Sequence, residues 1–136
     1  MAPQNALHVL VVDDDLGILS GLARLLQRDG HTVQTATDGH AALARLRERG
    51  YDLILCDLLM PALDGQALYE LLLCQSPSLC QRIIFLTGDT LGLESQVFLE
   101  RCGQPWILKP CGIAEVRTAM TQLLHAPMKD APEEQG

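Results

Sequence analysis

Aromatic residues are scarce in this chain, at 4% of its 136 residues, although hydrophobic residues of all kinds make up 48%. A chain of this length suits one domain with a substantial core, and that core must be built from Leu, Val, Ile and Ala. No stretch approaches the roughly 18 consecutive apolar residues of a membrane span. The segment Met1–Ala6 is too short and too polar for a signal peptide. We therefore expect no membrane segment in this chain.

Basic residues are also few, because 10 Lys and Arg stand against 17 Asp and Glu, for a net charge of -7. The basic residues form no stripe along the sequence. Proteins that bind nucleic acid directly need positive charge to neutralise phosphates. The charge balance therefore predicts no direct binding to nucleic acid.

Metal-binding patterns of cysteine and histidine are absent as well. The five cysteines never form a C-x-x-C pair, and the four histidines lack a ligand spacing such as i, i+4. An odd number of scattered cysteines indicates reduced thiols in a cytoplasmic protein, rather than a disulfide framework or a zinc site. We interpret the histidines as surface or packing residues.

Five short apolar runs alternate with five amphipathic segments. The runs predict strands at residues 7–12, 32–36, 53–57, 82–86 and 106–108. Apolar residues at helical spacing predict helices that include residues 19–26, 42–46, 66–74, 93–101 and 113–123, with a helix break at Ser76-Pro77-Ser78. This alternation predicts an α/β fold, a single doubly wound five-stranded parallel sheet with five helices. We expect one domain over residues 1–125 and a flexible tail over 126–136.

The third of these strands, Leu53–Asp57, consists of four apolar residues and then a carboxylate. A strand buried on both faces has no structural use for an unpaired charge at its end. The carboxyl end of a central parallel strand is, however, where open α/β sheets place their chemistry. Asp57 is therefore the leading candidate for a functional residue.

Other polar residues follow the neighbouring strands at the same kind of position. They are Asp13, Asp14, Thr87 and Lys109. All carboxyl ends of a parallel sheet meet at one edge, so these side chains are expected to converge on Asp57. Three carboxylates repel one another unless a divalent cation lies among them, and oxygen ligands alone favour Mg²⁺. A lysine and a hydroxyl beside the metal would receive a phosphoryl group.

With these residues in place, the chain resembles the receiver domain of two-component response regulators over about residues 6–125. The matching motifs are VVDDD, CDLLMPALDG, LTGDT and LKP, which follow four of the predicted strands. The resemblance implies a flavodoxin-like fold of the receiver type and a role in phosphorelay signal transduction. It implies as partner a histidine kinase or a histidine phosphotransfer protein. Such a module promotes its own phosphorylation and dephosphorylation, and is not a conventional turnover enzyme.

The resemblance also implies roles for single residues. Asp57 would be the phosphoacceptor that attacks the phosphohistidine of the partner and also a ligand of Mg²⁺. Asp14 would bind Mg²⁺ directly, Asp13 directly or through water, and the backbone carbonyl of Leu59 would complete the protein ligands. Lys109 would contact Asp57 and then the phosphoryl oxygens, with a cis peptide bond before Pro110.

The resemblance further implies a switch. Thr87 would move towards the phosphoryl group and Trp106 would follow, which would change the surface around the last two helices and the strand 106–108. Trp106 could equally be plain core, because single aromatic residues in strands usually are. Asp15 is expected to cap the first helix, and Asp89 to be a loop residue.

Three positions depart from the common family pattern. Leu59 is apolar two residues after the acceptor, where access of hydrolytic water is influenced. Cys111 follows Lys-Pro where Phe is common, and Trp106 replaces the commoner Tyr or Phe. Looser packing under the last loop and a hindered rotation of the aromatic side chain are therefore expected.

Two other functions remain open at this point. A metal-dependent phosphatase-like hydrolase also places Asp after a central strand, but typically has a second Asp two residues later, where this chain has Leu59. A phosphorylation-independent interaction module would not need all five polar residues. Only 11 residues follow His125, so we expect a stand-alone receiver or one excised from a longer chain, with a preference for the C-terminal receiver of a hybrid sensor histidine kinase.

Overall fold

The structure is a computed structural model that describes residues 6–88 and 92–125. Five strands and six helices lie in this part of the chain. The strands are β1 (His8–Val12), β2 (Thr32–Ala36), β3 (Leu53–Asp57), β4 (Ile83–Thr87) and β5 (Trp106–Leu108). The helices are α1 (Leu16–Arg28), α2 (Gly39–Glu48), α3 (Gly65–Gln75), α4 (Pro77–Cys80), α5 (Leu93–Cys102) and α6 (Ile113–His125).

All strand pairs are parallel, and the order across the sheet is β2-β1-β3-β4-β5. The chain first moves outward from β1 to β2, and then returns to place β3 on the other side of β1. The carboxyl ends of β1 and β3 therefore meet where the winding direction changes, which is where open α/β sheets form their crevice. The predicted doubly wound parallel sheet is confirmed.

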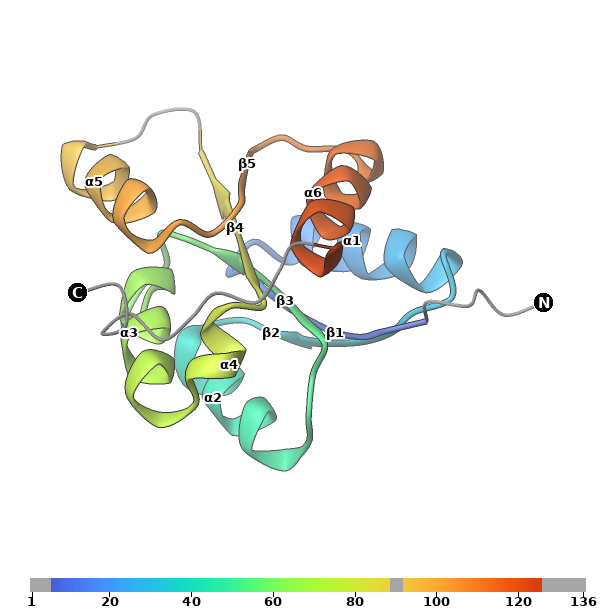
Figure 1. Ribbon diagram of the computed structural model, residues 1–136. Helices are drawn as coiled ribbons and strands as arrows, with labels where there is room; N and C mark the ends of the chain where they lie inside the picture. Colours follow the sequence, from blue (N-terminus) through green and yellow to red (C-terminus); the bar gives the residue numbers. More distant parts are fainter. Residues whose placement is uncertain (1–5, 89–91, 126–136) are drawn as a thin grey trace.

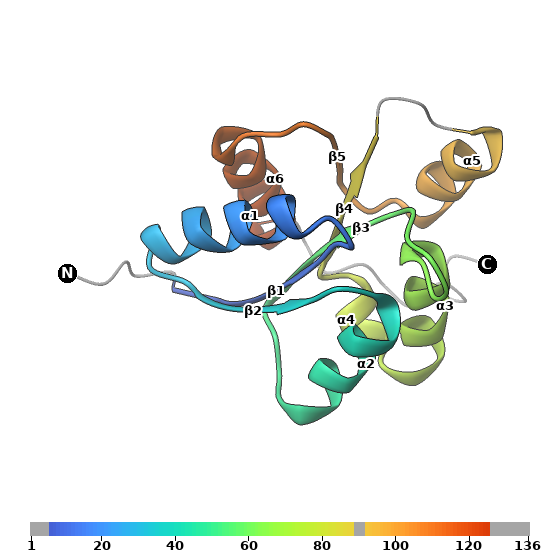
Figure 2. The same ribbon diagram turned by 180° about the vertical axis from the view of Figure 1, so that it is seen from behind.

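Helices cover both faces of the sheet (Figures 1 and 2). On one face, Val9, Val11, Leu53 and Leu55 pack against leucines of α1 and apolar residues of α6. The alternate strand residues point to the other face, where the buried side chains of α2, α3, α4 and α5 join them in a second cluster. Burial on both faces explains why β3 and β4 consist of uninterrupted apolar residues until their last position.

The prediction of five helices is wrong by one. The predicted break at Ser76-Pro77-Ser78 does end α3, whose last turn is closed by the Ser76 N–H donating to the Leu72 carbonyl. The same Ser76 then precedes the short helix α4, with Pro77 at its first position. Proline is accepted there because an N–H at the first helical position would have no partner within the helix, so its absence costs no hydrogen bond.

Aspartates begin three of the helices. Asp15 accepts from the N–H groups of Gly17 and Ile18 at the start of α1, which confirms its predicted capping role. Asp38 and Asp64 accept from Ala41 and Ala67 at the starts of α2 and α3, respectively. Side-chain oxygens at this position satisfy amides that have no partner within the helix.

The structure also bears on the cysteines and on the character of the helices. All five cysteines are free thiols. Within residues 6–88 and 92–125, no helix has the length and apolar character needed to cross a membrane. The expected tail over residues 126–136 and the expected loop position of Asp89 lie outside the described residues.

Candidate functional site

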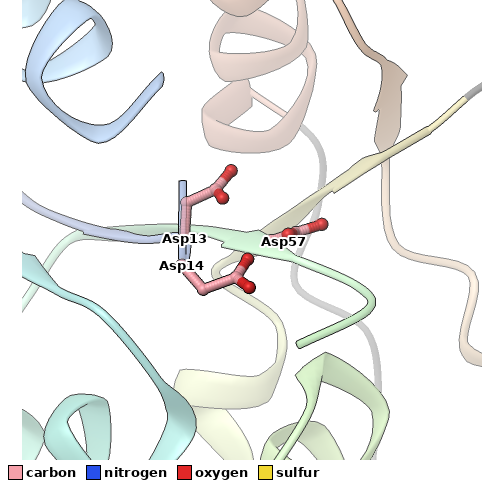
Figure 3. Close-up of side chains that lie close together, drawn as sticks. All are labelled: Asp13, Asp14 and Asp57. Atoms are coloured by element: carbon pink, nitrogen blue, oxygen red, sulfur yellow. The ribbon is translucent and has the colours of Figure 1, made fainter. Parts of the chain in front are cut away.

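Three carboxylates gather beyond the carboxyl ends of β1 and β3 (Figure 3). One oxygen from each of Asp13, Asp14 and Asp57 lies within 4.8 Å of the other two. Asp13 and Asp57 are buried, at 0% and 5% exposure, whereas Asp14 is exposed. The cluster therefore has a buried base and one side that is open to solvent.

Strand pairing explains why residues 44 positions apart meet. Val12 pairs with Cys56 in the β1–β3 register, so Asp13 and Asp57 follow side by side at the next position. Each lies two residues beyond a residue that points towards α1 and α6, namely Val11 and Leu55. Side chains two apart on a strand share a face, so both carboxylates project on the same side of the sheet edge.

Lys109 joins the two buried carboxylates. Its Nζ lies 3.2 Å from an oxygen of Asp13 and 3.3 Å from an oxygen of Asp57, and its side chain is 17% exposed. The Lys109 N–H also donates to the Thr87 carbonyl at 2.7 Å, which fixes the backbone at the end of β5. The peptide bond between Lys109 and Pro110 is cis, as the family resemblance implied.

The pKa of Asp57 is raised from its ordinary value of 3.8 to about 6, mainly because the group is buried and secondly because the negative charge of Asp13 is close by. Lys109 and a backbone hydrogen bond from Leu59 act against this by favouring the charged form. For Lys109 itself, burial lowers the pKa, but Asp57 and Asp13 outweigh burial and the pKa is raised. One positive charge thus faces two buried negative charges, and the site is electrostatically strained without a further cation.

Thr87 and Trp106 lie on the other side of the sheet from Lys109. Phe85 pairs with Trp106 and Thr87 with Leu108, so the four side chains share the face opposite Ile107. Thr87 is buried at 1% exposure, and its hydroxyl donates a long hydrogen bond of 3.5 Å to the Gly88 carbonyl, the only one that it forms with the described residues. Trp106 is 47% exposed, so it is not the plain core residue that remained possible from sequence.

The residues of the acidic cluster fit Mg²⁺. The donors are carboxylate oxygens, and no histidine or cysteine joins them among the described residues. Hard oxygen ligands, few in number and open to solvent on one side, suit an ion that retains part of its water shell. The cluster therefore offers a place for this cation beside the Asp57 carboxylate.

Two contacts of this site were not predicted from sequence. Lys109 pairs with Asp13 as well as with Asp57, and the Asp15 N–H donates to the other oxygen of Asp13 at 2.9 Å. Together these partners fix the Asp13 side chain within the site. The contact of Lys109 with Asp13 has no local signal in the sequence, because it depends on how the loops after β1 and β5 come together. The hydrogen bond between Asp15 and Asp13 is local, and is of the kind that Asp side chains form in turns.

Comparisons with known proteins agree with this geometry. The chain matches the family model of the response regulator receiver domain over residues 9–121. It is 31% identical over 122 residues to the transcriptional regulatory protein ZraR of Salmonella typhimurium, covering 89% of this chain and 27% of that protein. It is 32% identical over 124 residues to the alkaline phosphatase synthesis transcriptional regulatory protein PhoP of Bacillus subtilis, covering 91% of this chain and 51% of that protein. The chain thus spans about a quarter to a half of these curated relatives.

Solved structures share the fold. The structure of the chemotaxis protein CheY4 of Vibrio cholerae superposes with a TM-score of 0.77 at 27% identity, covering 87% of this chain and 98% of that chain. The single-sheet architecture is therefore that of a complete domain in this relative.

The raised pKa of Asp57 leads to a prediction about stability. A carboxyl whose pKa is raised in the folded state binds its proton more tightly there, so its ionisation destabilises the fold as pH rises from about 4 to about 6. The neutral variant Asp57→Asn should therefore melt at a higher temperature than wild type in EDTA at pH 7.5. This advantage should shrink towards zero as pH falls to 4. Thermal melts across that range measure it.

A matched control is Asp52→Asn, at the opposite end of β3. The Asp52 carboxylate accepts from the His8 N–H, and an asparagine oxygen can accept in its place. Its melting temperature should follow wild type at every pH. An Asp57→Asn variant that is less stable than wild type at pH 7.5 would contradict the electrostatic account.

Proposed function

Because this chain belongs to the response regulator receiver domain family of two-component signalling systems, we propose that it accepts a phosphoryl group on Asp57. The observation that carries this proposal is the pairing of buried Asp57 with Lys109 and with the acidic cluster at the switch point of the sheet. Phosphoryl transfer requires mainly in-line positioning and neutralisation of charge. These residues can supply both.

The transfer step follows from the position of the Asp57 carboxylate. One carboxylate oxygen attacks the phosphorus of a phosphohistidine, and an O–P bond forms as the P–N bond breaks. The bonding electrons return to the imidazole nitrogen of the donor. Lys109 lies 3.3 Å from Asp57, so its ammonium can follow the negative charge from the carboxylate to the new phosphoryl oxygens.

Receiver domains generally bind Mg²⁺ at an acidic pocket, and the Asp13, Asp14 and Asp57 cluster fits that ion. We assign Asp14 and Asp57 as direct ligands, Asp13 as a direct or water-mediated ligand, and the backbone carbonyl of Leu59 as the remaining protein ligand. When bound, Mg²⁺ neutralises charge on the transferring phosphoryl group. Exposed Asp14 leaves a path for the ion from solvent.

The signal would leave through Thr87 and Trp106. A phosphoryl group on Asp57 would offer new acceptors to the Thr87 hydroxyl, whose one hydrogen bond to the described residues is long. Movement of Thr87 would free space on the face that it shares with Trp106. The surface formed by α5, β5 and α6 would then change.

A histidine kinase or a histidine phosphotransfer protein is the partner that fits this chemistry. The origin from a hybrid sensor kinase and the absence of direct nucleic-acid binding both stay predictions. The two curated relatives named above are transcriptional regulators, of which this chain spans 27% and 51%.

The hydrolase alternative is less well supported by the site. Such an enzyme would use an acid two residues after the nucleophile, and Leu59 is there with an apolar side chain that is 55% exposed. Turnover would also require release of the phosphoryl group from Asp57 by an oriented water molecule. We therefore infer a phosphoacceptor with slow release and not a turnover enzyme.

The acceptor assignment predicts a single covalent adduct. Incubation with acetyl phosphate and Mg²⁺ should add about 80 Da, one phosphoryl group, to the intact mass of the wild-type protein. The Asp57→Ala variant should show no adduct, while Asp52→Asn should be labelled normally. Undiminished labelling of Asp57→Ala would refute the assignment, and multiple turnover of unrelated phosphate esters would favour the hydrolase.

The exposed Leu59 side chain predicts a long lifetime for the phosphorylated state. Leucine cannot orient a water molecule, whereas asparagine can form one hydrogen bond to it. A bond worth about 1 kcal/mol in the transition state corresponds to roughly fivefold faster hydrolysis. Dephosphorylation of Leu59→Asn should be faster than wild type by about this factor. Leu59→Ala controls for access alone, and an Asn variant no faster than the Ala variant would show that orientation is unimportant.

The single tryptophan reports on the switch. Saturating beryllofluoride with Mg²⁺, which stands in for the phosphoryl group, should draw Thr87 towards Asp57 and let the half-exposed indole turn inward. Its emission should then shift to shorter wavelength. The shift should disappear in Thr87→Ala although beryllofluoride still binds. An unchanged spectrum in saturated wild type would mean that Trp106 does not respond.

A further inference from the structure

The first residue of α2 lies unusually close to the loop between β3 and α3. A Cβ atom built on the buried Gly39 would overlap the backbone carbonyl oxygen of Leu63, and would lie 2.8 Å from the Cβ and Cγ atoms of that residue. Helix α2, which begins at Gly39, and helix α3, which follows the loop, lie side by side (Figures 1 and 2). A backbone oxygen cannot rotate away as a flexible side chain can. Only glycine therefore allows α2 to begin this close to the loop.

The loop is closed tightly at its base. The Leu58 N–H donates to the Leu86 carbonyl at 2.8 Å, and the Gly65 N–H donates to the Leu58 carbonyl at 2.9 Å. A Cβ on Gly65 would lie 2.7 Å from the carbonyl oxygen of Asp57, so the start of α3 packs directly on the backbone of the acceptor. The loop is thus held at Leu58 and Gly65, and residues 59–64 between these two points can adjust.

The middle of the loop carries backbone strain. Ala62 has a φ of 64°, and it is the only non-glycine residue with a positive φ in the part of the chain that the structure describes. An alanine in this left-handed region is disfavoured because its Cβ crowds the following carbonyl. Strained residues of this kind persist where the surroundings hold them. The next residue is Leu63, the one that contacts Gly39.

The same loop contributes backbone to the functional site. Leu59 provides a hydrogen bond to the Asp57 carboxylate, and Met60 anchors the loop in the core on the face covered by α2 and α3. A shift of Leu63 away from α2 would therefore pass through Ala62 and Pro61 towards Leu59. Because these residues are consecutive in the chain, the position of α2 affects where the Leu59 backbone lies relative to Asp57.

We propose that Gly39 is a positioning residue for the metal and phosphoryl site, acting through Leu63 to hold the β3–α3 loop in its strained conformation. This inference rests on the proposed function, because it takes the Leu59 backbone as part of that site. Gly39 itself contacts neither the carboxylates nor a phosphoryl group. Its lack of a side chain is what sets the loop position.

The test is the affinity of Gly39→Ala for Mn²⁺, used as a paramagnetic probe in place of Mg²⁺. Enhancement of water-proton relaxation measures binding without any phosphodonor. Partners that orient metal ligands typically change affinity by about 10- to 100-fold when altered. We expect Gly39→Ala to bind Mn²⁺ at least about tenfold more weakly than wild type.

Two controls separate positioning from simple loss of stability. Gly50→Ala makes the same chemical change at the other end of α2, where an added Cβ would have no atom within 4 Å, and it should bind Mn²⁺ as wild type does. Leu46→Ala removes a side chain of α2 that packs against the same core. It should lower the melting temperature and leave Mn²⁺ affinity unchanged.

A second variant approaches the contact from the loop. Leu63→Ala removes side-chain atoms that lie against Gly39, and should also weaken Mn²⁺ binding; it decides the question if Gly39→Ala does not fold. Wild-type affinity in Leu63→Ala and in any folded Gly39→Ala overturns the inference, while phosphorylation of wild type on Asp57 still stands. If wild type itself neither binds Mn²⁺ nor accepts phosphate, the proposed function is what fails.

Discussion

The repulsion between Asp13 and Asp57 is the constraint on which the site depends. Hydrogen bonding between β1 and β3 places these two carboxylates side by side, and the surrounding fold buries both of them. Lys109 offsets part of the charge from 3.2 and 3.3 Å. The stability of the sheet therefore keeps two carboxylates together although their charges repel each other. Functional sites often hold charged groups in such unfavourable positions.

The charge repulsion at Asp57 is the starting point of the proposed switch. In the proposed mechanism, a cation beside Asp57 would relieve the repulsion, and a phosphoryl group would then add oxygens for Lys109 and Thr87 to contact. Movement of the Thr87 hydroxyl would break only a long hydrogen bond among its contacts with the described residues. Trp106 is half exposed on the same face, so a change at Thr87 has a route to the surface. Strong charges at the sheet edge are thus linked to a weakly held side chain, which favours a switch over a rigid site.

The loop after Asp57 shows how the scaffold contributes beyond the charged residues. Gly65 packs on the backbone of Asp57, and Gly39, the first residue of α2, leaves room for Leu63 of the β3–α3 loop. Both glycines lie in Asp-Gly pairs, which the sequence marks as turns. Their role as contact points for two different segments is a matter of distance in three dimensions. It relates α2 to a site whose carboxylates and lysine come from other segments.

The sequence by itself determined the alternation of strands and helices, the parallel sheet and the five polar residues at its edge, because apolar runs and the residues that end them are local signals. Only the tertiary structure decided the strand order, the short helix α4, the bridge from Lys109 to Asp13 and the exposure of Trp106. Each of these depends on how segments far apart in sequence pack together. Trp106 illustrates the limit, since a lone aromatic in a three-residue strand carries no periodicity, and its burial is set by what lies beside β5. The left-handed Ala62 is similar, because its own sequence favours another conformation and its neighbours in space maintain the one observed.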